Sequence, residues 1–112
     1  SQSLEAADRW LSESVTANLA LAFDGRLEPT VRFHRPGAMP VVGADAARTW
    51  LDAQKPFAGA QALAAETARS GDLGYTYGTY ELAGSDRGFY VRVWTRGGDG
   101  FWRVALEVLQ PV

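Results

Sequence analysis

The fold is decided by SGDLGYTYGTYEL (Ser70–Leu82), which is followed by two further stretches, GFYVRVWTR (Gly88–Arg96) and FWRVALEVLQ (Phe101–Gln110). All three are rich in the aromatic and β-branched residues that favour strands. Segments that contain glycine separate them, as is typical of turns between neighbouring antiparallel strands. The sequence therefore predicts that the chain ends in a three-stranded meander.

The lengths of the turns predict how these strands pair. A turn at residues 97–100 places Trp94 opposite Arg103 and Tyr90 opposite Glu107. A loop at residues 84–87 places Tyr77 opposite Trp94. Because side chains alternate across a strand, this register puts Gly74 and Gly78 on a face that packs on helices. It gathers on the other face Tyr77, Tyr90, Arg92, Trp94 and Glu107.

The amino-terminal half reads first as a helix over Leu4–Leu27, where apolar residues recur every three or four positions. Ser3 can cap its start. Glycine within a helix costs about 1 kcal/mol relative to alanine, so a bend or break is expected around Asp24-Gly25. Pro29 then forces the chain out of the helix.

Three more elements precede the meander. We expect a short strand over Thr30–His34, a second helix over Gly43–Lys55 that Asp45 can cap, and a strand over Ala60–Arg69. Helices followed by a run of strands predict an α+β fold with the helices on one face of the sheet. The second face is too aromatic to be left fully in water, so it should face a ligand cavity, a second subunit or both.

Composition limits the classes of function. The 112 residues are expected to form one domain, residues 1–112, and the formal net charge of −2 argues against nucleic acid as a partner. No apolar run is long enough for a transmembrane helix. The chain has no cysteine and a single histidine, which leaves no thiolate or multi-histidine metal site, and no cofactor is expected. The compartment stays open: the cytoplasm, or the periplasm if a leader was removed.

The whole pattern resembles the nuclear-transport-factor-2-like superfamily, and within it the bacterial SnoaL-like and ketosteroid-isomerase-like branch. The resemblance covers nearly the whole chain, and four segments carry it: Arg35–Gly37, Ser70–Gly78, Tyr90–Trp94 and Asp99–Trp102. It implies a cone-shaped, curved antiparallel sheet wrapped around the N-terminal helices, a cystatin-like roll. The superfamily contains isomerases, cyclases, dehydratases, epoxide hydrolases and non-catalytic assembly domains, so the fold does not choose among them.

Two candidates for proton transfer follow from the resemblance. Isomerase-type members carry an acidic general base near the end of the first strand, but no Asp or Glu occupies residues 30–43 here. His34 lies in the matching region, and the usual pKa of histidine suits proton transfer near neutrality. Glu107 is the second candidate. The alternative for His34 is a histidine at the edge of a loop, bonded to water or backbone.

Ligand binding has its own candidates. The Arg-Val-Trp run at Arg92–Trp94 is similar to one in the association domain of calcium/calmodulin-dependent kinase, where the arginine lies in a polar pocket that accepts carboxylates. Arg92 is thus a candidate for binding a carboxylate, and the other candidates are Tyr77, Tyr90 and Trp94. The plainer interpretation makes Arg92 and Glu107 a cross-strand ion pair and the aromatic residues packing or dimer contacts.

Two hypotheses of different classes remain. The first is a homodimeric domain that binds a small apolar or carboxylate-bearing ligand in a cone pocket, with isomerase- or cyclase-like acid–base chemistry unproven. The second is a non-catalytic assembly or binding module that uses the sheet face for dimerisation. The sequence leaves open whether the protein is an enzyme.

Overall fold

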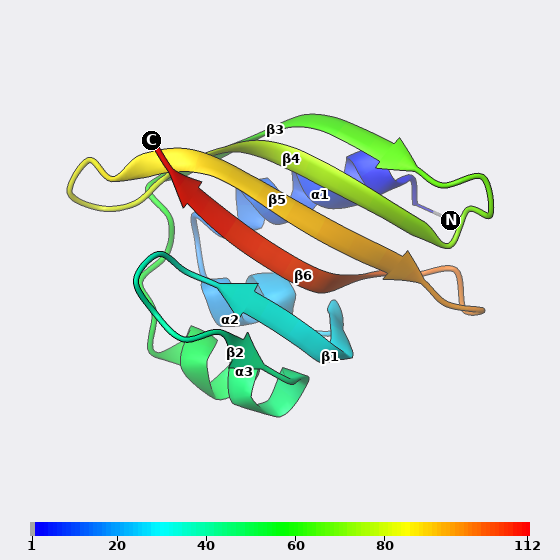
Figure 1. The fold of residues 1–112 in the computed structure, drawn as a ribbon, viewed down its shortest axis with the longest axis horizontal. Coiled ribbons are helices and arrows are strands. Elements are labelled where there is room, and N and C mark those ends of the chain that lie inside the picture. Colours follow the sequence, from blue (N-terminus) through cyan, green and yellow to red (C-terminus); the bar gives the residue numbers. More distant parts are fainter. Residues whose placement is uncertain (1) are drawn as a thin grey trace.

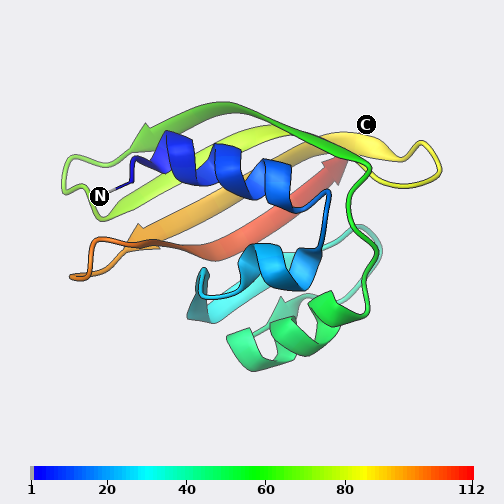
Figure 2. The ribbon, with the colours of Figure 1, turned by 180° about the vertical axis from the view of Figure 1, so that it is seen from behind.

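A computed structural model describes residues 2–112. Within them the chain forms one six-stranded sheet, and the helices all lie on one of its faces (Figures 1 and 2). None of the described helices is long and apolar enough to cross a membrane. The elements are, in order, α1 (Leu4–Ser14), α2 (Leu19–Phe23), β1 (Leu27–His34), β2 (Val41–Val42), α3 (Ala44–Asp52), β3 (Gly59–Thr67), β4 (Leu73–Glu81), β5 (Arg87–Arg96) and β6 (Trp102–Pro111).

The strands lie in the order β2-β1-β6-β5-β4-β3. The sheet is antiparallel except where β1 runs parallel to β6, so the first strand of the chain pairs with the last one. Figure 1 shows the long strands β3 to β6 curving together, and Figure 2 shows α1 lying across the hollow of that curve with α2 and α3 beside β1. The predicted α+β fold, a curved sheet around N-terminal helices, is confirmed.

The first helical region is divided earlier than the sequence indicated. The Oγ atom of Ser3 accepts a hydrogen bond from the Ala6 backbone N–H at 3.1 Å, which confirms the predicted cap of α1. The predicted break at Asp24-Gly25 is confirmed, since α2 ends at Phe23 and Gly25 has φ of 71°. A further break falls before Leu19, because the side chain of Asn18 accepts from the Leu21 N–H at 2.9 Å and starts α2 as a separate helix. The prediction of helix through Leu27 was wrong, since that residue begins β1.

The following elements differ from the prediction mainly at their ends. Strand β1 includes Pro29, which lies where the pairing with β6 is irregular and no ladder donor is needed. Gly43, with φ of 93°, precedes α3, so Asp45 does not cap it as predicted. That helix ends at Asp52, before the predicted end at Lys55. The strand predicted over Ala60–Arg69 is confirmed as β3.

The three strands of the meander are confirmed, but their predicted register was wrong. Trp94 pairs with Val104 instead of Arg103, and Tyr90 pairs with Leu109 instead of Glu107. Tyr77 pairs with Val91 instead of Trp94. The loop between β4 and β5 is closed by a backbone bond from Leu82 N–H to the Asp86 carbonyl, which shifts the pairing by an odd number of residues.

This odd shift leaves Tyr77 on the face away from the helices and puts Tyr90, Arg92 and Trp94 on the helix face, so the prediction that all four share the other face was wrong. Glu107 stays with Tyr90, Arg92 and Trp94 because a bulge in the pairing of β5 with β6 adds a second shift, which brings Arg92 directly opposite Glu107.

The two faces of the sheet differ sharply. On the helix face, a Cβ at Gly74 would lie 2.5 Å from Leu4 of α1, so glycine allows the close contact, as predicted for Gly74 and Gly78. Phe33 of β1 packs edge-on against Phe23 at 5.2 Å between ring centres. The other face, which we call the open face, carries large apolar side chains that are each 39–48% exposed: Leu73, Tyr75, Tyr77, Phe89 and Val91.

Candidate functional site

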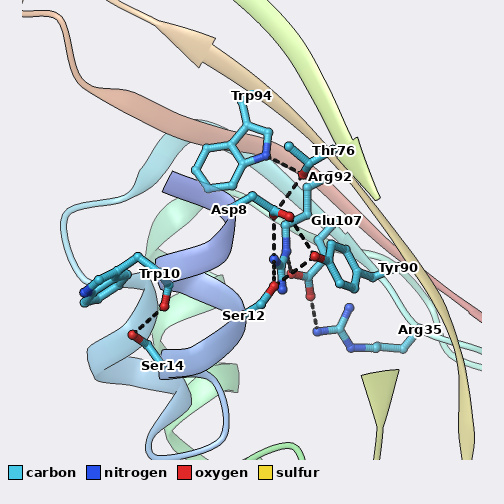
Figure 3. A network of polar contacts seen from close by, with 10 residues as sticks. All are labelled: Asp8, Trp10, Ser12, Ser14, Arg35, Thr76, Tyr90, Arg92, Trp94 and Glu107. Atoms are coloured by element: carbon cyan, nitrogen blue, oxygen red, sulfur yellow. Dashed lines mark hydrogen bonds and ion pairs between the residues drawn. The ribbon is translucent and has the colours of Figure 1, made fainter. Parts of the chain in front are cut away.

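A connected set of polar side chains is buried between α1 and the helix face of the sheet (Figure 3). We call it the buried cluster. Helix α1 contributes two residues, β4 one, β5 three and β6 one, while Arg35 reaches it from the loop after β1. Its members are Asp8, Ser12, Thr76, Tyr90, Arg92, Trp94, Glu107 and Arg35.

Arg92 is the centre of the buried cluster and is 0% exposed. Its Nε donates to Glu107 Oε2 at 2.7 Å, and its Nη1 donates to Asp8 Oδ1 at 2.8 Å. Nη1 also lies 3.0 Å from the Oγ of Ser12, and the guanidinium stacks 4.0 Å from the centre of the Tyr90 ring. Burial alone would lower the pKa of Arg92, but the charges of Glu107 and Asp8 outweigh it and raise the pKa. Arg92 is therefore held charged by the carboxylates around it.

Asp8 is the acceptor that joins α1 to the sheet. It is 1% exposed, and it accepts hydrogen bonds from the hydroxyls of Thr76 at 2.8 Å and Tyr90 at 2.6 Å as well as from Arg92. Trp94 Nε1 donates in turn to Thr76 Oγ1 at 2.9 Å. Burial raises the pKa of Tyr90. The charge of Arg92 acts to lower this pKa, and the charge of Asp8 acts to raise it further. The phenol is thus a neutral donor to the carboxylate.

Glu107 connects the buried cluster to Arg35. It is 0% exposed, with Oε2 bonded to Arg92 and Oε1 accepting from Arg35 Nη2 at 2.7 Å. Burial alone would raise the pKa of Glu107, but the charges of Arg92 and Arg35 and their hydrogen bonds hold it below its usual value. Both carboxylate oxygens are already bonded, so the geometry suits an anionic residue that positions Arg35.

The buried cluster contains two carboxylates and two guanidinium groups, so it is electrically neutral. Buried charges are tolerated when they are paired with opposite charges and hydrogen-bonded, although Nη2 of Arg92 has no hydrogen-bond partner within residues 2–112. This arrangement fixes α1 on the sheet. Its one member that reaches beyond the core is Arg35, whose side chain is 16% exposed.

Arg35 also lines a cavity of about 710 Å³. Most of its other lining residues come from the β4–β5 hairpin, the C-terminal end of β6 and the segment after α3, three parts of the chain that meet at one end of the molecule in Figure 2. This volume lies in the usual range for small-molecule sites. Apolar and aromatic side chains form its walls: Leu19, Trp50, Phe57, Tyr80, Leu82 and Leu109. Exposed charged side chains stand at its mouth: Lys55, Asp86 and Arg87. The cavity is thus lined by apolar side chains together with polar groups, and its charged side chains other than Arg35 lie among its exposed residues.

The structure brings Tyr90, Arg92, Trp94 and Glu107 together, as the sequence suggested, but it places them in the buried cluster behind the cavity wall. None of the four lines the cavity. Tyr77 lies on the open face and is 41% exposed, on the opposite side of the sheet from them.

His34 is half-buried at the end of β1, where its Nε2 lies 3.4 Å from the Nε of Arg32, and it does not line the cavity either. Within residues 2–112, no group of three or more Asp, Glu or His side chains could hold a metal ion.

The sequence analysis missed three residues that the structure makes central: Asp8, Arg35 and Tyr80. A signal for Asp8 was present, because Asp8 lies four residues after Leu4 and three before Leu11, on the apolar stripe of the helix. A charge on a buried stripe requires a partner. Arg35 had no such signal, since it follows a strand and precedes proline, as loop residues commonly do.

Comparison with known proteins places the fold. No family model matches the sequence, and no curated protein matches it. Among solved structures, a ketosteroid isomerase-like protein from Erwinia carotovora atroseptica is similar with a TM-score of 0.79 and 12% identity, over 97% of this chain and 93% of that one. An NTF2-like protein from Cytophaga hutchinsonii gives a TM-score of 0.72 and 15% identity, over 95% and 93%.

A third structure names the fold directly. An NTF2-like protein with a cystatin-like fold from Novosphingobium aromaticivorans has a TM-score of 0.68 and 12% identity, over 94% of this chain and 77% of that one. Identities this low speak for the fold alone. The chain has the NTF2-like, cystatin-like fold that the sequence resemblance implied.

Proposed function

We propose that this chain is a small-molecule-binding domain whose ligand occupies the cavity beside Arg35. The observation that carries the proposal is the cavity itself: about 710 Å³, walled by Trp50, Phe57 and Tyr80 with aliphatic side chains between them. Pockets of this size and character are the usual sites for small organic ligands. One structure with this fold is named ketosteroid isomerase-like, which agrees with a cavity for an apolar molecule.

Binding is favoured over acid–base catalysis by the state of the candidate acids and bases. Both oxygens of Glu107 are bonded to arginines, and its pKa is held low by them after burial is overcome. His34 does not line the cavity. A general base must come within hydrogen-bond reach of the proton it removes. Isomerase- or cyclase-like chemistry by these two residues therefore requires them to move, whereas ligand binding does not.

A thermal-shift screen tests the proposal, with neutral steroids, polycyclic aromatics and small organic acids as probes. A ligand at 100 times its dissociation constant stabilises the folded state by about 2.7 kcal/mol, which gives a clear rise in Tm. Leu82→Trp places an indole in the cavity and should abolish the rise. Leu21→Trp is the matched control, because Leu21 lies on α2 away from the open face, does not line the cavity and is 69% exposed. A rise that survives Leu82→Trp, or no rise with any probe, contradicts the proposal.

For the partner we propose a second copy of this chain on the open face. Its core of Tyr75, Tyr77, Phe89 and Val91 carries no charged side chain and is exposed to water at 39–48% per residue. Exposed patches of this kind mark association sites, and a two-fold axis lets one patch pair with itself. If the dimer forms and no ligand binds, the assembly module is the better account of the function.

Sedimentation velocity tests the dimer. Val91→Asp puts a charge in the middle of the open face and should give monomers at micromolar concentration. Leu21→Asp puts the same charge on α2, on the helix side of the sheet, where Leu21 is 69% exposed, and should leave the dimer intact. A wild-type monomer at the same concentration would refute this partner.

A further inference from the structure

We propose that Arg35 and Tyr80 together form a subsite for a single carboxylate inside the cavity, so that the ligand is an organic monoacid with an apolar body. This inference rests on the proposed function, because it names the class of ligand that the same cavity takes. Three features support it: the contacts that position Arg35, the hydroxyl of Tyr80 that has no hydrogen-bond partner among residues 2–112, and the net charge around the cavity.

Arg35 is positioned before any ligand arrives. Its Nη2 is bonded to buried Glu107, and its guanidinium lies 5.0 Å from the ring centre of Trp50 and 5.5 Å from that of Phe33. Such cation–π distances favour the flat face of the guanidinium against the rings. Nη1 makes only a long contact of 3.5 Å with the His34 carbonyl, and Nε has no partner among residues 2–112. Nε–H and Nη1 do not share an edge of the guanidinium, since each is paired with Nη2, so each is available to give a carboxylate a single charge-assisted hydrogen bond.

Tyr80 provides the second donor. The residue is 2% exposed, its ring packs 6.0 Å from that of Phe57, and it lines the same cavity as Arg35. Its hydroxyl makes no hydrogen bond within the described part of the chain and is reached by solvent, so it is free to donate to a ligand in the cavity. Burial raises the pKa of Tyr80, while the charge of Arg35 acts to lower it and that of Asp86 to raise it. The phenol is therefore a neutral O–H donor within the electrostatic reach of Arg35.

The charges around the cavity favour an anionic ligand with a single charge. The buried cluster, Arg35 included, is neutral. The mouth of the cavity adds two cations, Lys55 and Arg87, against the one carboxylate of Asp86. This leaves one positive charge over the cavity and its surroundings. One ligand carboxylate brings the region to neutrality, whereas a second would lie in a partly desolvated site without a counter-charge.

Calorimetric titration with 2-naphthoate and 2-naphthamide tests the subsite, because the two probes share the same rings and differ in the charge of one group. We expect wild type to bind the naphthoate at least about tenfold more tightly. Loss of a hydrogen bond to a charged group corresponds to about tenfold or more in the dissociation constant, so Tyr80→Phe should weaken the naphthoate by that factor. Tyr80→Phe removes only an unbonded hydroxyl, so its fold is expected to be unaffected.

Arg35→Gln should remove the preference for the naphthoate and leave the affinity for the naphthamide unchanged. Arg87→Gln is the matched control at the exposed rim. We expect it to raise the dissociation constant of the naphthoate by less than about threefold, and this effect should decrease as salt is added. Equal affinities of the two probes for wild type, or equal losses in Arg35→Gln and Arg87→Gln, would overturn the subsite. So would a naphthoate that fails to bind at about 5 mM while the naphthamide binds, an outcome that leaves the ligand cavity standing. Failure of both probes at that concentration would count against the subsite and the cavity together.

Discussion

Replacing Arg92 by methionine is the sharpest perturbation of the buried cluster. Methionine is close to arginine in length, but it removes the bonds to Asp8 Oδ1, Ser12 Oγ and Glu107 Oε2 at 2.8, 3.0 and 2.7 Å. Asp8 and Glu107 stay in place, 1% and 0% exposed, with one counter-charge between them instead of two. Removing one partner of a buried ion pair costs about 3–5 kcal/mol. We expect Arg92→Met to lose that much of the free energy of unfolding, which is a large share of the 5–15 kcal/mol typical of a domain.

The pH dependence of this loss has a definite sign. In wild type the pKa of Glu107 is lowered, so the stability it contributes is present above its unfolded pKa and is lost as the pH falls through the folded pKa. In Arg92→Met the burial of Glu107 is opposed by Arg35 alone, and its pKa should rise above the wild-type value. The destabilisation is then largest while Glu107 is ionised and is relieved as it takes up a proton. The difference between variant and wild type should therefore shrink as the pH falls from about 7 to the usual pKa of glutamate, about 4.3.

Urea unfolding at the two pH values measures both effects. Arg103→Met is the matched control, because Arg103 pairs with Asp99 at 2.8 Å on the surface, with side chains 31% and 46% exposed. Such pairs contribute about 0–1 kcal/mol. A loss below about 1 kcal/mol in Arg92→Met, or a loss that does not depend on pH, would refute the claim that the buried cluster consists of mutually compensating charges.

Two further substitutions test the packing and the helix boundary. Gly78→Ala would place a Cβ 2.1 Å from the Gln61 carbonyl oxygen and 2.5 Å from the Tyr90 ring, so thermal melting should show a loss of about 1–3 kcal/mol. Gly98→Ala meets nothing within 4 Å and should be close to neutral, and equal melting of the two variants would contradict the packing. Asn18→Ala removes the cap of α2 and should cost about 1 kcal/mol in urea unfolding, while Asn18→Asp should retain most of the stability. No loss in Asn18→Ala would mean that the helix boundary is set by packing instead of the cap.

The sequence predicted the fold because the fold depends on local patterns. The strands of the meander follow from β-branched and aromatic residues bounded by glycine, and the cap at Ser3 follows from residue type alone. Strand β3 is rich in alanine and was expected only because a helix there would run directly into the turn at Ser70-Gly71-Asp72. The register did not follow, because it depends on one extra residue in a bulge and on how the β4–β5 loop closes. Side-chain alternation turns a shift of an odd number of residues into a change of face, and Tyr77 was therefore grouped with the wrong partners.

The candidate site was predicted only in part, for a similar reason. Arg92 and Glu107 were recognised as neighbours from strand alternation, which places both on one face. Asp8 and Arg35 come from α1 and a loop, and their distance from β5 and β6 along the chain, 84 residues between Asp8 and Arg92, hides the contact from any local pattern. The cavity likewise forms where the segment after α3, the β4–β5 hairpin and the C-terminus meet.

The most direct test of the account is an NMR titration of the ¹⁵N-labelled wild-type protein with 2-naphthoate. Ligand in the cavity predicts amide shift changes concentrated in residues 50–57, 82–87 and 109–112, which line it. It also predicts a shift of the Arg35 Nε–Hε signal, identified by its absence from the spectrum of Arg35→Gln. Changes centred on Tyr75, Tyr77 and Val91 of the open face, or no changes at all, would contradict the claim that this protein binds a small acid within its cone.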